Sequence, residues 1–310
     1  MRIHQIILAL ALLINTLAFS LMLRGVEPFS TYFYVFAWWT YILFISSVNH
    51  LTSRNSLLFD NSREFVWIFL FSTPLWLFFE IYNFRLNNWH YVGIPFEYYL
   101  RWPGYVISFG TVLPSILETK TFLANTGVFT LVQGRGIRVT RGLLVRFVLA
   151  GLLMMLFTPF RPDLFFPTVW VGGVLILDPI LYQSKGREAS LLAQAERGKY
   201  STFAQLLLSG LICGGLWEFW NYWAEAKWVY TVPYLDFLRI FEMPLLGFLG
   251  FAPFALECYL FYQGFRLIRQ RLAIAPRLVP LALALLTIFY CIVAFMGIDR
   301  WTVQMYKITL

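Results

Sequence analysis

The sequence predicts an all-α polytopic membrane protein of about nine transmembrane helices, built as two parallel four-helix repeats plus one C-terminal helix. Composition indicates the membrane class, because 59% of the 310 residues are hydrophobic and only 13% are charged, whereas soluble domains carry about 25% charged residues. Uncharged runs at 6–23, 32–48 and 278–296 are long enough to span a bilayer as helices. These runs are continuously apolar rather than alternating, so membrane strands are a poor alternative.

The first repeat is expected to occupy residues 1–130. Its spans are predicted at about 5–23, 31–50, 64–84 and 103–121. The first span is expected to be a retained anchor, because no clear small-x-small cleavage site follows it. The fourth span is short and is interrupted by Gly104, Gly110 and Pro114.

The second repeat, residues 131–267, follows the same plan. Its spans are predicted at about 141–159, 164–183, 202–222 and 244–266. The last of them is interrupted by Pro244, Gly247, Gly250 and Pro253. Residues 268–310 add one further span, at about 277–297, which has no counterpart in the first repeat.

The repeat is inferred from motifs that recur in one order, 138 or 139 positions apart. The matched pairs are Glu80 with Glu218, Asn83 with Asn221, Trp89 with Trp228, Tyr91 with Tyr230, and Glu118 with Glu257. The pattern Pro-aromatic-x-x-aromatic-Leu-Arg also occurs twice without a gap, at 95–101 and 233–239. Aromatic loops follow the third and seventh spans, at 84–102 and 222–242.

Charge distribution predicts the orientation. Sixteen of the 24 lysines and arginines lie at the N-terminus or in connectors after even-numbered spans, which predicts a cytoplasmic N-terminus and an outer C-terminus. Both aromatic loops then lie on the outer side. The net charge of +8 is expected to set the orientation of the spans rather than to indicate nucleic-acid binding. The expected location is a bacterial inner membrane.

Acidic residues within predicted spans are the candidate catalytic groups. A carboxylate at the centre of a membrane helix costs roughly 2.5–3.5 kcal/mol on insertion scales, so it is expected to face a partner or a cavity. The candidates are Glu80, Glu118, Glu218 and Glu257. Matched spans interrupted by glycine and proline also indicate a binding site in duplicated membrane proteins.

Polar and aromatic residues near these acids are the candidate substrate-binding groups. They are Asn83, Asn221, Trp89, Trp228, Tyr91, Tyr230, Trp217, Glu242 and Asp178. The simpler interpretation is that the polar groups join helices and that the aromatic residues form an interfacial belt. The sequence leaves both interpretations open.

The available side chains restrict the chemistry. The sequence contains no nucleophile elbow, phosphate-binding loop, dinucleotide fingerprint or HExxH motif, and we expect no metal and no cofactor. Carboxylic acids can protonate an alkene, and aromatic faces can stabilise the resulting carbocation by about 2 kcal/mol or more when desolvated. This chemistry would isomerise or cyclise an isoprenoid lipid.

The duplicated motifs resemble the membrane lycopene cyclase domain of carotenoid biosynthesis, in its heterodimeric or fused form. The matching residues are Trp89, Tyr91, Pro114 and Glu118, then Trp228, Tyr230, Pro253 and Glu257. The resemblance implies two similar helical halves and a hydrophobic isoprenoid substrate. The paired glutamates that follow proline in that family are absent here, where a single glutamate follows after three intervening residues.

Two other functions are compatible with the sequence. In a proton- or ion-coupled transporter or flippase, the same acids would bind the ion between the two repeats. In a non-catalytic scaffold subunit, they would join helices of a larger complex. The oligomeric state is not predicted.

Overall fold

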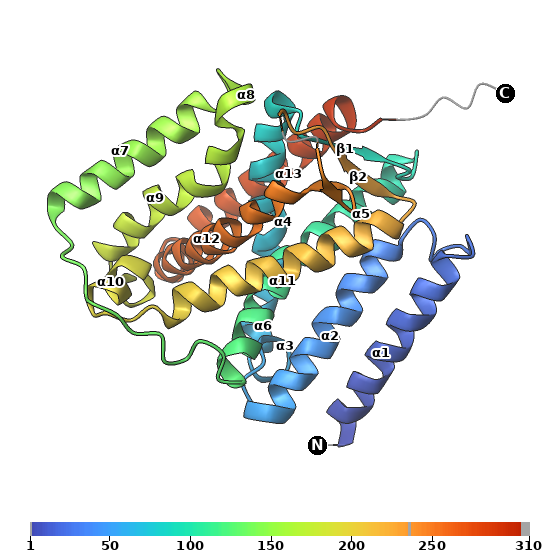
Figure 1. The fold of residues 1–310 in the computed structure, drawn as a ribbon, viewed down its shortest axis with the longest axis horizontal. Helices are drawn as coiled ribbons and strands as arrows, with labels where there is room; N and C mark the ends of the chain where they lie inside the picture. The colour runs from blue at the N-terminus through green and yellow to red at the C-terminus, as the bar shows by residue number, and fades with distance from the viewer. Residues whose placement is uncertain (1, 235–236, 305–310) are drawn as a thin grey trace.

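Helices make up most of the chain (Figure 1). The computed structural model describes residues 2–234 and 237–304. Up to residue 125 the elements are α1 (Arg2–Met22), α2 (Phe33–Ser53), α3 (Leu57–Asp60), α4 (Ser62–Leu86), β1 (Trp89–Val92), α5 (Tyr98–Phe109) and α6 (Val112–Asn125). They are followed by α7 (Arg141–Phe157), α8 (Pro162–Phe165), η1 (Phe166–Thr168), α9 (Val169–Tyr182), η2 (Arg187–Ala189), α10 (Leu191–Glu196), α11 (Ser201–Trp223), β2 (Lys227–Tyr230), β3 (Arg239–Ile240), β4 (Met243–Pro244), η3 (Leu245–Gly250), α12 (Phe251–Leu272) and α13 (Leu278–Trp301).

Six helical segments within the described residues are long and apolar enough to cross a membrane. They are Arg2–Met22, Ser62–Leu86, Pro162–Tyr182, Ser201–Trp223, Leu245–Leu272 and Leu278–Trp301. Their outer faces carry large apolar side chains that the protein does not cover, such as Leu13 on α1 and Leu285 on α13. Length, composition and exposed apolar surface therefore support a helical membrane protein with several spans.

The other three predicted spans coincide with helices that do not meet the same criteria of length and hydropathy. The helix α2 is long enough, but its last part is polar and includes Ser46, Ser47 and Asn49. The helix α7 has only 17 residues, and the span predicted at 103–121 is divided between α5 and α6. The number of nine spans and the repeat architecture therefore stay predictions.

Both spans that were expected to be interrupted are interrupted. The first is divided between Phe109 and Val112, where Gly110 packs so closely that a Cβ atom would lie 2.2 Å from Phe69 Cε2. Gly104 and Pro114 lie within α5 and α6 and do not break them. The second runs as a 3₁₀ helix, η3, and becomes an α-helix only at Phe251. In each half a shorter segment therefore precedes the main helix.

The two aromatic loops are more ordered than the sequence indicates, because they form strands that pair with each other. β1 and β2 are antiparallel, with Trp89 opposite Tyr230 and Tyr91 opposite Trp228. Four-residue strands are too short for a clear periodic signal, and their partners lie far apart in the chain. This pairing joins the two halves of the molecule directly. Residues 235–236, within the second copy of the proline motif, lie outside the described residues.

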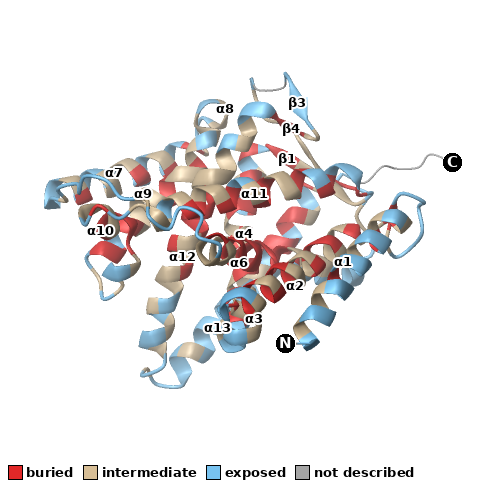
Figure 2. Ribbon diagram, turned by 60° about the horizontal axis from the view of Figure 1, so that its bottom comes forward, coloured by how far each residue is buried: buried red, intermediate tan, exposed pale blue. Residues whose placement is uncertain are grey.

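Buried residues are concentrated at the centre of the molecule, whereas the outer helices show long exposed stretches (Figure 2). Aromatic side chains make much of this core. Trp38 on α2, which is fully buried, has its ring centroid 5.3 Å from that of Trp217 and 5.0 Å from that of Trp220, both on α11. The first half therefore packs against the second through indole rings.

A buried ion pair fixes α13 to α5. Arg101 donates from Nε and Nη2 to the two carboxylate oxygens of Asp299, at 2.8 Å each. Trp102 Nε1 and Tyr105 OH donate to the same carboxylate. Arg101 is only 6% exposed, so its charge depends on this partner.

Replacing Asp299 with alanine is expected to destabilise the fold by about 3–5 kcal/mol, because Arg101 would remain buried without its counter-charge. Thermal unfolding of the purified protein in detergent measures the change. Asp163→Ala is the matched control, since Asp163 pairs with Arg161 at the exposed surface, where ion pairs contribute little. Equal changes in the Tm of the two variants would contradict the prediction.

Candidate functional site

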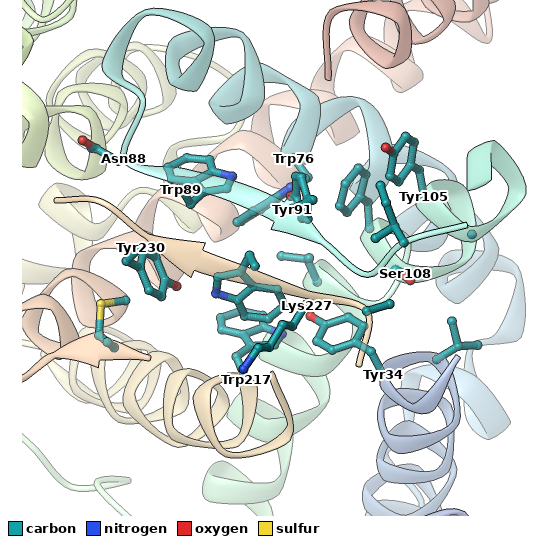
Figure 3. Close-up of a pocket in the computed structure, with 18 of the residues that line it drawn as sticks. Tyr34, Trp76, Asn88, Trp89, Tyr91, Tyr105, Ser108, Trp217, Lys227 and Tyr230 are labelled. Atoms are coloured by element: carbon teal, nitrogen blue, oxygen red, sulfur yellow. The ribbon is translucent and has the colours of Figure 1, made fainter. Parts of the chain in front are cut away.

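A pocket with a volume of about 200 Å³ lies along the β1–β2 pair, between the two halves of the chain (Figure 3). Helices α2, α4, α5, α6, α9, α11 and α12, together with η3 and both strands, contribute to its walls. Its aromatic lining residues are Tyr32, Tyr34, Trp76, Trp89, Tyr91, Tyr105, Phe109, Phe166, Trp170, Trp217, Trp228, Tyr230, Phe251 and Phe254. Such walls suit an apolar molecule.

Glu80 lies behind the part of the wall that the first half contributes. The residue is completely buried. Its Oε1 accepts hydrogen bonds from Trp76 Nε1 at 2.8 Å, Trp89 Nε1 at 3.1 Å and Tyr91 OH at 2.5 Å. Its Oε2 has no hydrogen-bond partner among the described residues. All three donors line the pocket, so this acid is linked to the pocket through aromatic side chains.

Glu218 occupies the corresponding place in the second half, but it receives fewer hydrogen bonds. It is also completely buried, and its Oε1 accepts a hydrogen bond from Tyr230 OH at 2.8 Å. Within residues 2–234 and 237–304, no group donates to its Oε2, and the indole nitrogen of Trp228 has no hydrogen-bond partner. The two equivalent acids therefore have unequal surroundings.

Asn83 and Asn221 hold the strands in place. Asn83 Nδ2 donates to Trp89 O at 2.7 Å, and its Oδ1 accepts from Asn88 N at 2.8 Å. Asn221 Nδ2 donates to Trp228 O at 2.8 Å, and its Oδ1 accepts from Trp228 N at 2.9 Å. Neither asparagine lines the pocket, so both position the strands rather than contact a ligand there.

Glu118 and Asp178 are engaged in helix packing. Glu118 accepts hydrogen bonds from Asn49 Nδ2 at 2.7 Å and from Ser46 Oγ at 2.8 Å, which join α6 to α2. Asp178 accepts from Leu191 N at 2.8 Å and so caps the start of α10. Both groups agree with the simpler interpretation that polar residues join helices.

Glu257 and Glu242 have separate environments. Glu257 is completely buried and accepts a hydrogen bond from Gly173 N at 2.6 Å. A Cβ atom on Gly173 would lie 2.3 Å from Glu257 Oε1, so this contact requires glycine. Glu242 Oε1 lies 2.6 Å from Lys227 Nζ, and Lys227 lines the pocket.

The candidate acids face hydrogen-bond partners rather than this pocket. Among the described residues no aspartate or glutamate lines the pocket. The predicted residues that do line it are Trp89, Tyr91, Trp217, Trp228 and Tyr230. Glu80 and Glu218 lie one layer behind, because a carboxyl group buried this deeply is surrounded by the donors that satisfy it.

Sequence reasoning missed several lining residues, including Tyr34, Trp76, Tyr105, Trp170 and Lys227. Trp76 could have been found, because it precedes Glu80 by four residues and so shares its helix face. The others come from helices and strands that only the tertiary fold brings to the pocket.

The two tyrosines of the strands are fixed as neutral donors. Burial raises the pKa of Tyr91 and of Tyr230 well above the ordinary value, and the adjacent glutamate raises each pKa further. Both phenols therefore keep their protons at physiological pH. In the part of the chain that the structure describes, no three His, Cys, Asp or Glu residues gather as a group that could hold a metal ion.

Asn83→Ala is expected to destabilise the protein on the order of 3 kcal/mol, because Asn88 N and Trp89 O would lose a buried partner. Equilibrium unfolding in detergent measures the change. Asn55→Ala is the control, since Asn55 is exposed and makes only a 3.4 Å contact with Asn125. A loss of stability no larger than that of the control would contradict the anchoring role.

Comparisons of this chain with protein-family models, curated proteins and solved structures find no match.

Proposed function

We propose that the protein is a cofactor-free integral membrane enzyme that isomerises or cyclises an isoprenoid or carotenoid lipid in this pocket. The observation that carries the proposal is that two pocket-lining tyrosines each bond to a buried carboxyl group, Tyr91 to Glu80 and Tyr230 to Glu218. The aromatic walls favour an apolar chain. The paired groups offer a route for protons between the acids and that chain.

Glu218 is proposed as the acid. Among the described residues its carboxyl group accepts one hydrogen bond, from Tyr230 OH, whereas Glu80 accepts three, so a negative charge is stabilised less at Glu218 than at Glu80. The Glu218 Oε1 and Tyr230 OH oxygens lie 2.8 Å apart. When the Glu218 carboxyl is protonated, it can donate its proton to the Tyr230 oxygen while Tyr230 OH donates to an alkene carbon. The π electrons form the new C–H bond, Tyr230 regains a proton, and Glu218 becomes a carboxylate.

Glu80 is proposed as the base. Three donors converge on its Oε1, an arrangement that suits a carboxylate. The carbocation, stabilised by the aromatic faces, loses a proton from a neighbouring carbon to the Tyr91 oxygen as the Tyr91 proton moves to Glu80. The C–H electrons form the new double bond. The lipid gains one proton from Tyr230 and loses one proton to Tyr91. Exchange with water then returns Glu218 to its protonated form and Glu80 to its carboxylate form.

The lycopene cyclase resemblance agrees with this chemistry, and so we propose a related substrate class. A coupled transporter or flippase is the competing function, and it would need the halves to move against each other. The β1–β2 pairing favours the enzyme, because it links the halves directly beside the pocket. We also propose a bacterial inner membrane location with a cytoplasmic N-terminus, on the distribution of basic residues.

Glu218→Gln is expected to lower product formation at least ~10²-fold, because an amide cannot supply the proton. The assay expresses the chain in a host that makes linear isoprenoids and follows the ring content and retention of extracted lipids by chromatography. Glu188→Gln is the matched control, since Glu188 is exposed and pairs with Arg197 away from the pocket; its products are expected to match the wild type.

Normal product formation by Glu218→Gln at equal expression would remove Glu218 as the acid. An unchanged lipid profile with the wild type, together with solute flux that depends on a pH gradient, would instead favour the transporter.

A further inference from the structure

A second pocket, with a volume of about 180 Å³, lies between the loop that follows α9 and the last turns of α12. Its charged and polar lining residues are Lys185, Glu188, Gln263, Arg266 and Gln270. The three residues from α12 are spaced three and four positions apart, so they share one helix face. A Cβ atom on Gly186 would lie 2.8 Å from Leu267 Cδ1, so the loop packs directly against this helix. The second pocket is therefore polar, unlike the aromatic pocket along β1 and β2.

The acidic side chains at the second pocket are already bound. Glu188 accepts hydrogen bonds from Arg197 at both carboxylate oxygens, at 2.7 and 2.8 Å. Glu64 on α4 is shared by two arginines: its Oε1 lies 3.4 Å from Arg266 Nε, and its Oε2 accepts a hydrogen bond from Arg269. Because one carboxylate serves two cations there, the charge of Arg266 is only partly balanced.

In the part of the chain that the structure describes, Lys185 brings a positive charge that has no acidic partner. The side chain is exposed. Four basic and two acidic residues then surround the second pocket, which gives a net charge of +2 (4 − 2). They are Lys185, Arg197, Arg266 and Arg269, with Glu64 and Glu188. The surplus charge favours an anionic ligand.

The second pocket lies where two helical segments that are long and apolar enough to cross a membrane come to an end. Lys185 follows the segment Pro162–Tyr182 by three residues, and Gln270 precedes the end of Leu245–Leu272 by two. Lysine and arginine side chains at such places reach the head groups while their stems remain on apolar surface. Ile268, in the same turn of α12, is 53% exposed. A lipid supplies an anionic group together with apolar chains, whereas a soluble anion supplies only the first.

We propose that the second pocket binds the phosphate group of an anionic membrane lipid. Lys185 and Arg266 bind the phosphate oxygens. Gln263 Oε1 accepts a hydrogen bond from Arg266 Nη1 at 3.0 Å, which orients the guanidinium and leaves the Gln263 amide NH₂ as a further donor. On the proposed orientation the pocket faces the cytoplasmic leaflet, where basic pockets between helices bind anionic head groups. The inference goes beyond the proposed reaction and does not depend on acid catalysis.

Matched lipids test the charge of the head group. Phosphatidylglycerol and phosphatidylcholine with the same acyl chains both carry a phosphate, but only phosphatidylglycerol has a net negative charge. Equilibrium binding of the fluorescently labelled lipids to the purified full-length protein in neutral detergent is expected to be on the order of 10-fold tighter for phosphatidylglycerol. Added salt is expected to reduce this preference, because it screens exposed charges.

Lys185→Gln and Arg266→Gln are each expected to lower the preference about 3-fold, as equal shares of the 10-fold effect. Lys185 is exposed and unpaired among the described residues, so Lys185→Gln remains informative if Arg266→Gln weakens the fold through Glu64. Lys199→Gln is the matched control, since Lys199 is exposed and lies outside the second pocket; it removes the same charge and is expected to keep the preference.

Equal binding of the two lipids overturns the inference, and so does a preference that is unchanged in both pocket variants. An equal loss in Lys199→Gln would show a general effect of surface charge and overturn the assignment to this pocket. Displacement of labelled phosphatidylglycerol by the same concentration of inorganic phosphate would show a site for a soluble anion and overturn the choice of a lipid. Product formation is a separate measurement, so failure of the lipid site leaves the proposed reaction unaffected.

Discussion

A carboxyl group in a membrane helix must obtain its hydrogen bonds from its own protein, because the surrounding hydrocarbon supplies none. Glu80 and Glu218 obtain hydrogen bonds to Oε1 from donors on the strand that follows each helix, whereas neither Oε2 has a partner among the described residues. The strands must therefore turn back over the helix ends, and Asn83 and Asn221 fix that turn by bonding to backbone groups at its far side. The position of the pocket wall follows from these contacts.

The two strands then pair with each other, which places the two acid–tyrosine units on either side of one pocket. Pairing satisfies backbone groups that would otherwise be exposed in an apolar region. It also brings together helices from both halves of the chain. The pocket between the halves thus results from the way the strands turn back over the ends of α4 and α11 and pair with each other.

In both halves a buried glutamate accepts a hydrogen bond from a strand tyrosine, but the number of further donors to the glutamate differs. Glu80 has a tryptophan four residues before it on the same helix, whereas glycine occupies that place before Glu218. This one difference removes a donor from the second acid.

The sequence by itself determined the membrane class, the places where two helices are interrupted, and most of the acids, amides and indoles near the site, because these depend on local composition and spacing. The tertiary structure alone decided which of them meet. It placed Glu118 and Asp178 in helix packing and Glu80 and Glu218 behind aromatic side chains. It also paired two loops that sequence reasoning had taken as irregular, since contacts between distant segments leave no local periodic signal.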